Sequence, residues 1–232
     1  MIRVKKLYKK FYTGDRELIA INDLNFEVPT GQFLAITGRS GAGKSTLLYQ
    51  MSLLDHPTSG SVTIDGQEIT VLPGPKRVIF RLDNCGFIFQ DYALLPSLTA
   101  AENVILPMLM QGRSEDESGD KAYAALSHVG LEKLTDHLPS QLSGGEQQRV
   151  SIARAIVHGP RYLFADEPTA NLDVESSEMI LGIFLKLNKR QDLTIVMVTH
   201  EPEYARLADR NIELLDGKII RDVSYKKKKL TR

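Results

Sequence analysis

The order of hydrophobic and polar positions along the chain predicts an α/β fold. Apolar and polar residues alternate over residues 2–7 and 24–28, which predicts strands of an antiparallel layer at the N-terminus. Continuous apolar runs indicate strands that are buried on both faces of a parallel sheet. These runs occupy residues 33–37, 86–89, 162–165 and 194–199. Helical stretches lie between them, and this alternation is typical of an α/β domain.

The middle of the chain has a different pattern. From residue 91 onward it is rich in helix-forming stretches and contains a polar segment at residues 112–120. We therefore predict a single domain over residues 1–232. Residues 1–90 and 159–232 form its core, and residues 91–158 form a helical subdomain inserted into that core.

A glycine-rich segment follows the first apolar run. Residues 38–46 read GRSGAGKST and match the phosphate-loop pattern, with a predicted helix after them. Glycines let the backbone turn tightly and bring its N–H groups near phosphate oxygens, and the helix N-terminus adds positive potential. Lys44 supplies a point charge for the outer phosphates, and the Ser45 hydroxyl is placed to hold Mg²⁺. A turn that binds nothing is the alternative, and the flanking strand and helix favour a site. The predicted nucleotide ligands are Gly38, Arg39, Ser40, Gly41, Ala42, Gly43, Lys44, Ser45 and Thr46.

Two carboxylates follow the apolar run at residues 162–165. Ligands of a parallel sheet bind beyond the C-terminal ends of its strands, so Asp166 is expected beside the glycine-rich loop. A carboxylate there can hold Mg²⁺. The next one, Glu167, can orient and polarise an attacking water. The alternative is an acidic pair in a loop that only caps the next helix.

Residues 141–149, QLSGGEQQR, predict a helix start. Ser143 is an N-cap candidate, and Glu146 stands three residues later, which is the capping-box spacing. Gly144 and Gly145 are poor helix formers and indicate that a ligand approaches the backbone closely. The segment thus predicts a second anion-binding surface at a helix N-terminus, with a simple helix start as the alternative.

The amino-acid composition narrows the possible class of protein only slightly. Lys plus Arg and Asp plus Glu both number 29, so no strong global field attracts nucleic acid or a membrane. Cys85 is the single cysteine, which excludes an internal disulfide and fits a reducing compartment. No apolar run approaches the roughly 20 residues of a membrane helix, and a cytosolic protein is expected. The lysine run at residues 226–229 is expected to be a solvated tail, with contact to an anionic membrane surface as a weaker alternative.

The segment LSGGEQQR resembles the signature sequence of the ABC (ATP-binding cassette) ATPases. The other motifs follow in that family's order. GRSGAGKST resembles Walker A, Gln90 the Q-loop glutamine, and residues 162–166 Walker B. Glu167 matches the catalytic glutamate, residues 171–173 the D-loop, and His200 the switch histidine. GFIFQDYALLPSLTAAENVILP and ADEPTANLD are similar to the LolD/MacB/FtsE group, whose members the sequence does not separate.

The resemblance implies a P-loop NTPase core with a mixed, parallel sheet, an N-terminal antiparallel β subdomain and an inserted helical signature subdomain. It also implies a homodimer that closes head to tail around two ATP molecules. One chain would contribute the catalytic residues Lys44, Gln90, Glu167 and His200 and the Mg²⁺ ligands Ser45, Gln90 and Asp166. The other chain would contribute Ser143, Gly144, Gly145 and Glu146.

Two positions depart from the family's pattern. The family usually has a tyrosine that stacks on adenine in the N-terminal loop, and this chain has Phe11 with Tyr12 beside it. Either ring offers an apolar face for stacking. Ala170 stands where close relatives usually have glycine, and alanine disfavours a positive φ in the D-loop.

The resemblance also implies a partner, an integral membrane permease with a large extracytoplasmic domain. A short cytoplasmic helix of that permease would dock near residues 90–98 and hold the chain at the inner face of the cell membrane. Leu94, Leu95, Pro96 and Leu98 make this stretch apolar, and internal packing is an equal alternative. A regulatory ATPase without transport, as in FtsE, shares the same residues. A DNA-repair ABC ATPase is disfavoured because the chain lacks a long heptad insert and a basic charge, and no nucleic-acid partner is expected.

Overall fold

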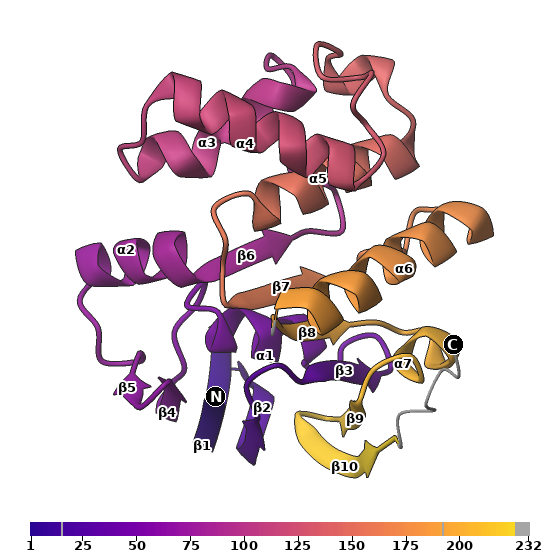
Figure 1. Ribbon diagram of the computed structural model, residues 1–232. Helices are drawn as coiled ribbons and strands as arrows, with labels where there is room; N and C mark the ends of the chain where they lie inside the picture. The colour runs from indigo at the N-terminus through magenta and orange to yellow at the C-terminus, as the bar shows by residue number, and fades with distance from the viewer. Residues whose placement is uncertain (15, 192, 226–232) are drawn as a thin grey trace.

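The computed structural model describes residues 1–14, 16–191 and 193–225, in three layers (Figure 1). A six-stranded sheet lies in the middle, a layer of helices covers one side, and a small antiparallel sheet lies on the other. The lysine run predicted to be a solvated tail, residues 226–229, lies outside the described residues.

The central sheet has the strand order β10-β9-β3-β8-β7-β6. Its parallel strands are β3 (Phe33–Gly38), β6 (Cys85–Ile88), β7 (Tyr162–Asp166), β8 (Thr194–Val198) and β9 (Arg210–Leu215). The four strands predicted from apolar runs are confirmed. Two strands of this sheet were not predicted, β9 and the antiparallel edge strand β10 (Lys218–Ser224), whose mixed burial leaves no continuous apolar run.

The second sheet is antiparallel and has the order β2-β1-β4-β5. Its strands are β1 (Ile2–Thr13), β2 (Arg16–Val28), β4 (Ser59–Ile64) and β5 (Gln67–Glu68). The predicted strands at residues 2–7 and 24–28 are confirmed as parts of the longer β1 and β2. The register of β1 shifts between Val4 and Leu7, where Lys6 has a φ of 44°. This bulge changes the phase of the alternation, so that Leu7 is buried after Ile2 and Val4.

The helices are α1 (Lys44–Met51), α2 (Gly74–Asn84), α3 (Ala100–Met110), α4 (Glu115–His128), α5 (Gly144–Ile156), α6 (Val174–Gln191) and α7 (Pro202–Ala205), with a short 3-10 turn at Pro139–Gln141. α3, α4 and α5 pack together above the central sheet (Figure 1). Within the described ranges, no helix is both long and apolar enough to cross a bilayer.

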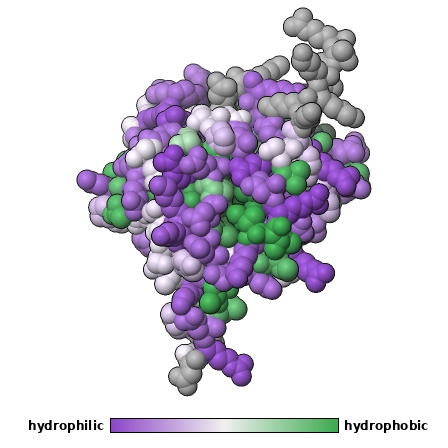
Figure 2. Space-filling model, turned by 90° about the horizontal axis from the view of Figure 1, so that it is seen from below, coloured by the Kyte–Doolittle hydropathy of each residue, from purple (hydrophilic) through white to green (hydrophobic). Residues whose placement is uncertain are grey.

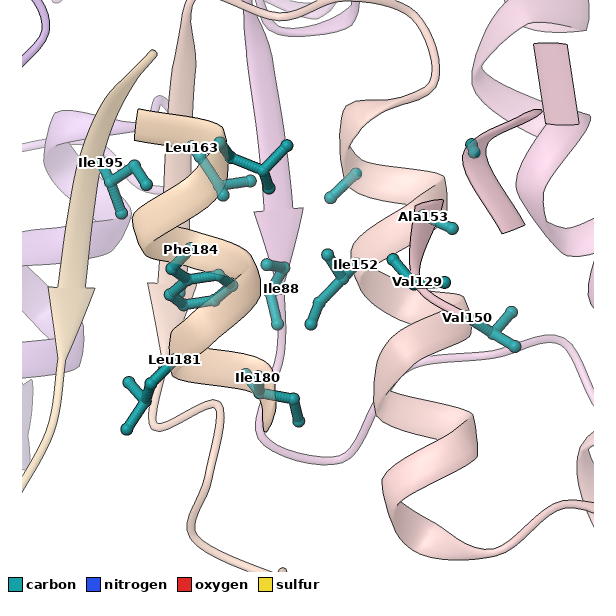
Figure 3. Packing of buried hydrophobic residues seen from close by; sticks show 14 of the residues in the cluster. Ile88, Val129, Val150, Ile152, Ala153, Leu163, Ile180, Leu181, Phe184 and Ile195 are labelled. Carbon is teal, nitrogen blue, oxygen red and sulfur yellow. The ribbon is translucent and has the colours of Figure 1, made fainter. Parts of the chain in front are cut away.

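Two hydrophobic cores enclose the central sheet, one on each face. On the helical side, Ile88 of β6, Ile152 of α5 and Phe184 of α6 point toward one another (Figure 3). On the other side, Leu34 and its sheet neighbours pack against α1 and the antiparallel sheet. Burial on both faces fixes the strands, so the loops at their C-terminal ends start from rigid positions.

Candidate nucleotide-binding site

The C-terminal ends of β3, β6, β7 and β8 meet at one edge of the central sheet. Parallel strands place their C-terminal ends together, and ligands of such sheets bind there. The loop that begins at Gly38 follows β3, and Gln90 lies two residues beyond β6. Asp166 ends β7, and His200 lies two residues beyond β8. The predicted convergence of these motifs is therefore observed.

The glycine-rich loop is shaped by two tightly enclosed glycines. Gly38 has a φ of 147° and Gly43 a φ of 96°. A Cβ on Gly38 would collide with the carbonyl oxygen of Leu214, and a Cβ on Gly43 would collide with that of Ala20. Gly41 has a φ of 77° but open space around it, so its requirement is conformational only. The loop is thus pressed between β9 and β2 and leads directly into α1.

Lys44 places its charge inside the loop. Its side chain is only 6% exposed, and its Nζ donates to the carbonyl oxygen of Arg39 at 3.2 Å. The same nitrogen lies 3.8 Å from Oε1 of Glu167. A buried ammonium with one carbonyl partner and a loosely placed carboxylate is available to an incoming phosphate oxygen.

Ser45 and Asp166 form a pair of hard oxygen donors. Ser45 Oγ donates to Oδ1 of Asp166 at 2.8 Å. Tyr49 bonds the same carboxylate, and burial together with this bond raises the pKa of the Tyr49 hydroxyl to about 12. Oxygen ligands of this kind fit Mg²⁺, which is commonly held by one or two protein groups, water and substrate phosphates. In the described part of the chain no three His, Cys, Asp or Glu side chains cluster as a metal site.

Glu167 has a strained backbone and two polar neighbours. Its φ is 45°, an uncommon value that costs a non-glycine residue of the order of 1–3 kcal/mol. Its N–H donates to the carbonyl oxygen of Val198 at 3.0 Å, which ties it to β8. Its Oε2 lies 2.8 Å from Nδ1 of His200, whose side chain is 54% exposed. The His200 ring is thus held by a carboxylate and not by backbone, and Nε2 is turned away from that bond.

The Q-loop and the D-loop meet beside this pair. Asn171 Nδ2 donates to the carbonyl oxygen of Gln90 at 3.2 Å. Ala170 has a negative φ, and its N–H donates to the carbonyl oxygen of Glu167 at 3.2 Å. Alanine therefore causes no backbone strain where relatives were expected to have glycine.

The predicted capping box at the start of α5 is confirmed. Ser143 Oγ accepts from the Glu146 N–H at 3.3 Å, and Oε2 of Glu146 accepts from the Ser143 N–H at 2.8 Å. The Ser143 hydroxyl also donates to Oε2 of Glu146 at 2.8 Å. The two bonds that Ser143 donates to the Glu146 carboxylate, the backbone one first, lower the pKa of that carboxyl. Ser143 is exposed.

The two glycines at the start of α5 have a packing explanation that the sequence did not reveal. A Cβ on Gly145 would lie 2.7 Å from Oγ of Ser176, and a Cβ on Gly144 would lie 2.9 Å from the Tyr92 hydroxyl. An added Cβ would therefore meet a neighbouring segment of the same chain, the loop after β6 at Gly144 and the first turn of α6 at Gly145.

The signature segment and the glycine-rich loop belong to opposite faces of the central sheet. Val150 and Ile152 of α5 lie in the core on the helical side, whereas Leu47 and Leu48 of α1 lie in the other core. Figure 1 shows α5 above the sheet and α1 below it. The structure thus brings together Lys44, Ser45, Asp166, Glu167 and His200 but leaves Ser143 apart from them.

The family model of the ABC transporters matches residues 21–170 of this chain. The chain belongs to the ABC transporter family. The Bacillus subtilis ABC transporter ATP-binding protein YvrO is 43% identical over 224 residues, which cover 96% of each chain. The probable syringafactin export ATP-binding/permease protein SyfD of Pseudomonas syringae is 43% identical over 222 residues. These cover 96% of this chain and 34% of SyfD, so the chain spans about a third of that relative's length.

A solved structure supports the same family. The dimeric, post-hydrolysis structure of the ATP-binding cassette MJ0796 bound to ADP and Pi has a TM-score of 0.91 and 38% identity, and covers 97% of this chain and 98% of that one. The ABC family and fold predicted from the motifs are confirmed, and the chain is an ABC-type ATPase cassette.

The two aromatic candidates of this ABC cassette lie on opposite faces of β1. Lys9 Nζ lies 5.0 Å from the centre of the Phe11 ring, so these two side chains lie together on one face of β1. Lys9 Nζ also bonds the Asp55 carboxylate and the carbonyl oxygen of His56 in the loop after α1. Tyr12 follows Phe11 without a register shift, so it points to the other face, and it is 68% exposed, against 41% for Phe11. Phe11 thus lies on the same side of β1 as Lys9.

Tyr49 was missed by sequence reasoning, although a signal was present. It lies four residues after Ser45 on α1, so both side chains share one helix face and reach the same carboxylate.

Proposed function

We propose that this cassette hydrolyses ATP at the interface of a head-to-tail homodimer and drives a conformational change in a separate transmembrane subunit. One observation carries the proposal: the Glu167 carboxylate, at the end of β7, lies within reach of both Lys44 and His200. A carboxylate beside a phosphate-binding lysine is where a water-orienting base must be.

The chain's own residues divide the chemistry among them. The loop amides and Lys44 bind the phosphates, and Ser45 and Asp166, with Gln90, would hold Mg²⁺. When bound, Mg²⁺ supplies neutralisation of phosphate charge. Glu167 orients the attacking water. His200 contacts Glu167 through Nδ1, and its Nε2 would contact the terminal phosphate.

The second half of the site comes from the partner copy in this proposal. Ser143 is exposed at a helix N-terminus, where free amides and the helix dipole favour an anion. Ser143, Gly144, Gly145 and Glu146 then face the terminal phosphate held by the other chain. The MJ0796 cassette, which is dimeric with ADP and Pi, supports this arrangement. ATP that binds both chains stabilises the closed dimer.

Phe11 is our choice for the ring that stacks on adenine. Its ring lies beside Lys9, which bonds the loop after α1, whereas Tyr12 points to the other face of β1. Figure 2 shows the hairpin of β1 and β2 as a narrow projection with apolar surface at its base. Leu18 pairs with Phe11 across the hairpin and is itself exposed.

The membrane partner is proposed to dock in an apolar cavity of about 400 Å³ between α2, β6 and α3. Val78, Leu95 and Met110 line it and are exposed, whereas Leu94 packs against the core. The apolar stretch after Gln90 thus contains both an internally packed leucine and a cavity-lining one. SyfD, an ATP-binding/permease protein, supports a permease partner. The proposal also gives this permease an extracytoplasmic domain and places the chain at the inner face of the membrane.

The same proposal keeps residues 91–158 as a helical subdomain that moves against the core of residues 1–90 and 159–232. Packing of α3, α4 and α5 on one another supports this division.

Phosphate release by the purified chain with Mg-ATP tests the proposed function. We expect steady hydrolysis by the wild type and loss of hydrolysis in Lys44→Ala. Lys121→Ala is a matched control, since Lys121 is an exposed lysine that pairs with Glu117 in α4. A wild-type chain with no hydrolysis, alone or with its permease, would contradict the proposal.

A further inference from the structure

The loop after β6 has an unusual backbone. Tyr92 and Ala93 are consecutive non-glycine residues in the left-handed region, with φ values of 63° and 48°. Residues with a Cβ adopt this conformation rarely, because the Cβ approaches the next carbonyl oxygen. Two in succession persist only where neighbouring groups hold them.

A single side chain holds both residues. Arg154 of α5 donates from Nη2 to the carbonyl oxygen of Tyr92 at 2.8 Å and from Nη1 to that of Ala93 at 2.6 Å. A guanidinium is a rigid, planar fork, so it matches two adjacent acceptors in a way that a lysine does not. Burial lowers the pKa of Arg154, and the Asp91 carboxylate opposes that shift.

Arg154 is itself fixed against the strand that leads into this loop. A Cβ on Gly86 of β6 would collide with the carbonyl oxygen of Ala155, so α5 and β6 are in direct backbone contact. On the other side of the loop, Asn171 holds the carbonyl oxygen of Gln90. Gln90 therefore lies between an anchor from the D-loop and a turn anchored by Arg154.

We propose that Arg154 is a positioning residue for Gln90. Arg154 holds the strained turn, and this turn sets where the Gln90 side chain lies relative to the nucleotide. This inference rests on the proposed ATPase function. Ala93 and Arg154 also line the apolar cavity beside β6. A segment that enters the cavity therefore contacts the same turn, and its movement reaches the nucleotide site through the backbone of residues 90–93.

Steady-state kinetics of purified variants tests this role. Arg154→Met removes both hydrogen bonds but keeps an apolar side chain, and we expect kcat to fall roughly tenfold while KM for ATP stays within about twofold. Arg154→Lys keeps the charge but not the planar, forked guanidinium, and its kcat is expected to lie between those of the wild type and Arg154→Met. Arg3→Met is the control: Arg3 donates to the Glu27 carboxylate at 2.6 Å in the antiparallel sheet and does not line the cavity, and the kcat of this variant should match the wild type.

A second measurement needs no hydrolysis. Without nucleotide, deuterium uptake by the backbone amides of residues 89–95 should rise in Arg154→Met and stay unchanged in Arg3→Met. Ala93→Gly should restore part of the lost kcat in the Arg154→Lys background, because glycine adopts a positive φ without a Cβ.

The outcomes separate the two proposals. A folded Arg154→Met chain with wild-type kcat and wild-type uptake overturns the positioning role, and so does a rise in uptake that spreads over all of α5. If Arg154→Met does not fold, the same readouts on Arg154→Lys decide. If the wild-type chain shows no hydrolysis but deuterium uptake at residues 89–95 still rises in Arg154→Met, the proposed function is overturned. The hold of Arg154 on the turn is then retained.

Discussion

The cassette has two glycine-rich helix starts, and they use glycine for different reasons. In the loop before α1, Gly38 and Gly43 have positive φ values, and an added Cβ would strike backbone oxygens. At the start of α5, Gly144 and Gly145 are helical, and an added Cβ would meet the ends of the Tyr92 and Ser176 side chains. Backbone cannot yield without moving a strand, whereas a side chain can rotate.

The difference indicates how each region works. The loop before α1 is preformed by the sheet and ready to bind a phosphate in a single chain. The start of α5 is held by adjustable side-chain contacts, and Ser143 Oγ is engaged with Glu146 at 2.8 Å. We infer that the first region determines nucleotide affinity and that the second acts only when two chains meet.

The largest effect is expected at Glu167, whose carboxylate is the proposed base beside the loop before α1. Glu167→Gln keeps the side chain's size but removes the base, so turnover should fall by about 10²–10⁴-fold. Binding of ATP should stay close to wild type, because Lys44 and the loop are intact. Phosphate release together with a fluorescent-nucleotide titration measures both quantities. Loss of binding equal to the loss of turnover would contradict the assignment of Glu167 as a base.

The next effect separates the two regions by affinity. Lys44→Ala removes a charge-assisted bond to phosphate, and ATP should bind to the single chain about 10–100-fold more weakly. Ser143→Arg should leave that affinity unchanged and abolish turnover, because Ser143 acts on the partner's nucleotide. Titrations at low protein concentration compare the two. Equal weakening by both substitutions would remove the distinction between the regions.

Sequence reasoning succeeded where the signal was local. The phosphate loop, the carboxylates after β7 and the capping box each depend on a few consecutive residues, and the structure has each at its predicted element. The bond from Asn171 to Gln90 and the clamp by Arg154 join residues about 60 to 80 positions apart. No periodicity reports such pairings, and the packing reason for Gly145 became visible only beside Ser176.

The bulge in β1 shows the same limit of sequence reasoning for the fold. Strict alternation from Ile2 predicts that Lys6 is buried, yet Lys6 is exposed and Leu7 is buried, because the bulge shifts the phase. The strand itself was predictable, and its register was not.

Stability measurements sharpen the comparison of the glycines. Gly43→Ala should cost about 3 kcal/mol, because it combines a positive φ with a backbone collision. Gly145→Ala should change stability by less than about 1 kcal/mol, since alanine's helix propensity offsets the rotation of Ser176. Ser176→Ala in the Gly145→Ala background should reduce the remaining cost, because it removes the contact with Oγ but keeps the one with Cβ at 3.1 Å. Chemical denaturation gives the three values, and similar costs at both glycines would contradict the contrast.

The smallest effect concerns the capping box. Hydrogen bonds from the Ser143 backbone and side chain lower the pKa of Glu146, so ionised Glu146 favours the folded state. This stabilisation is present above the ordinary value of 4.5 and is lost as pH falls through the lower, folded value. Glu146→Gln should therefore cost about 0.5 kcal/mol at pH 7, and the difference from wild type should shrink below pH 4.5. A difference that is constant across this range would exclude the carboxylate as its cause.

Mixing two defective chains tests the composite site most directly. In a Glu167→Gln background, one chain carries Lys44→Ala and the other Ser143→Arg, and each is checked for folding by circular dichroism. Alone with Mg-ATP, both should remain monomeric in analytical ultracentrifugation. Mixed, they should form a heterodimer with one bound nucleotide, because the second chain's loop and the first chain's α5 are both intact. A mixture that stays monomeric at concentrations where the Glu167→Gln parent dimerises, or a Ser143→Arg chain that dimerises as well as that parent, would contradict the account.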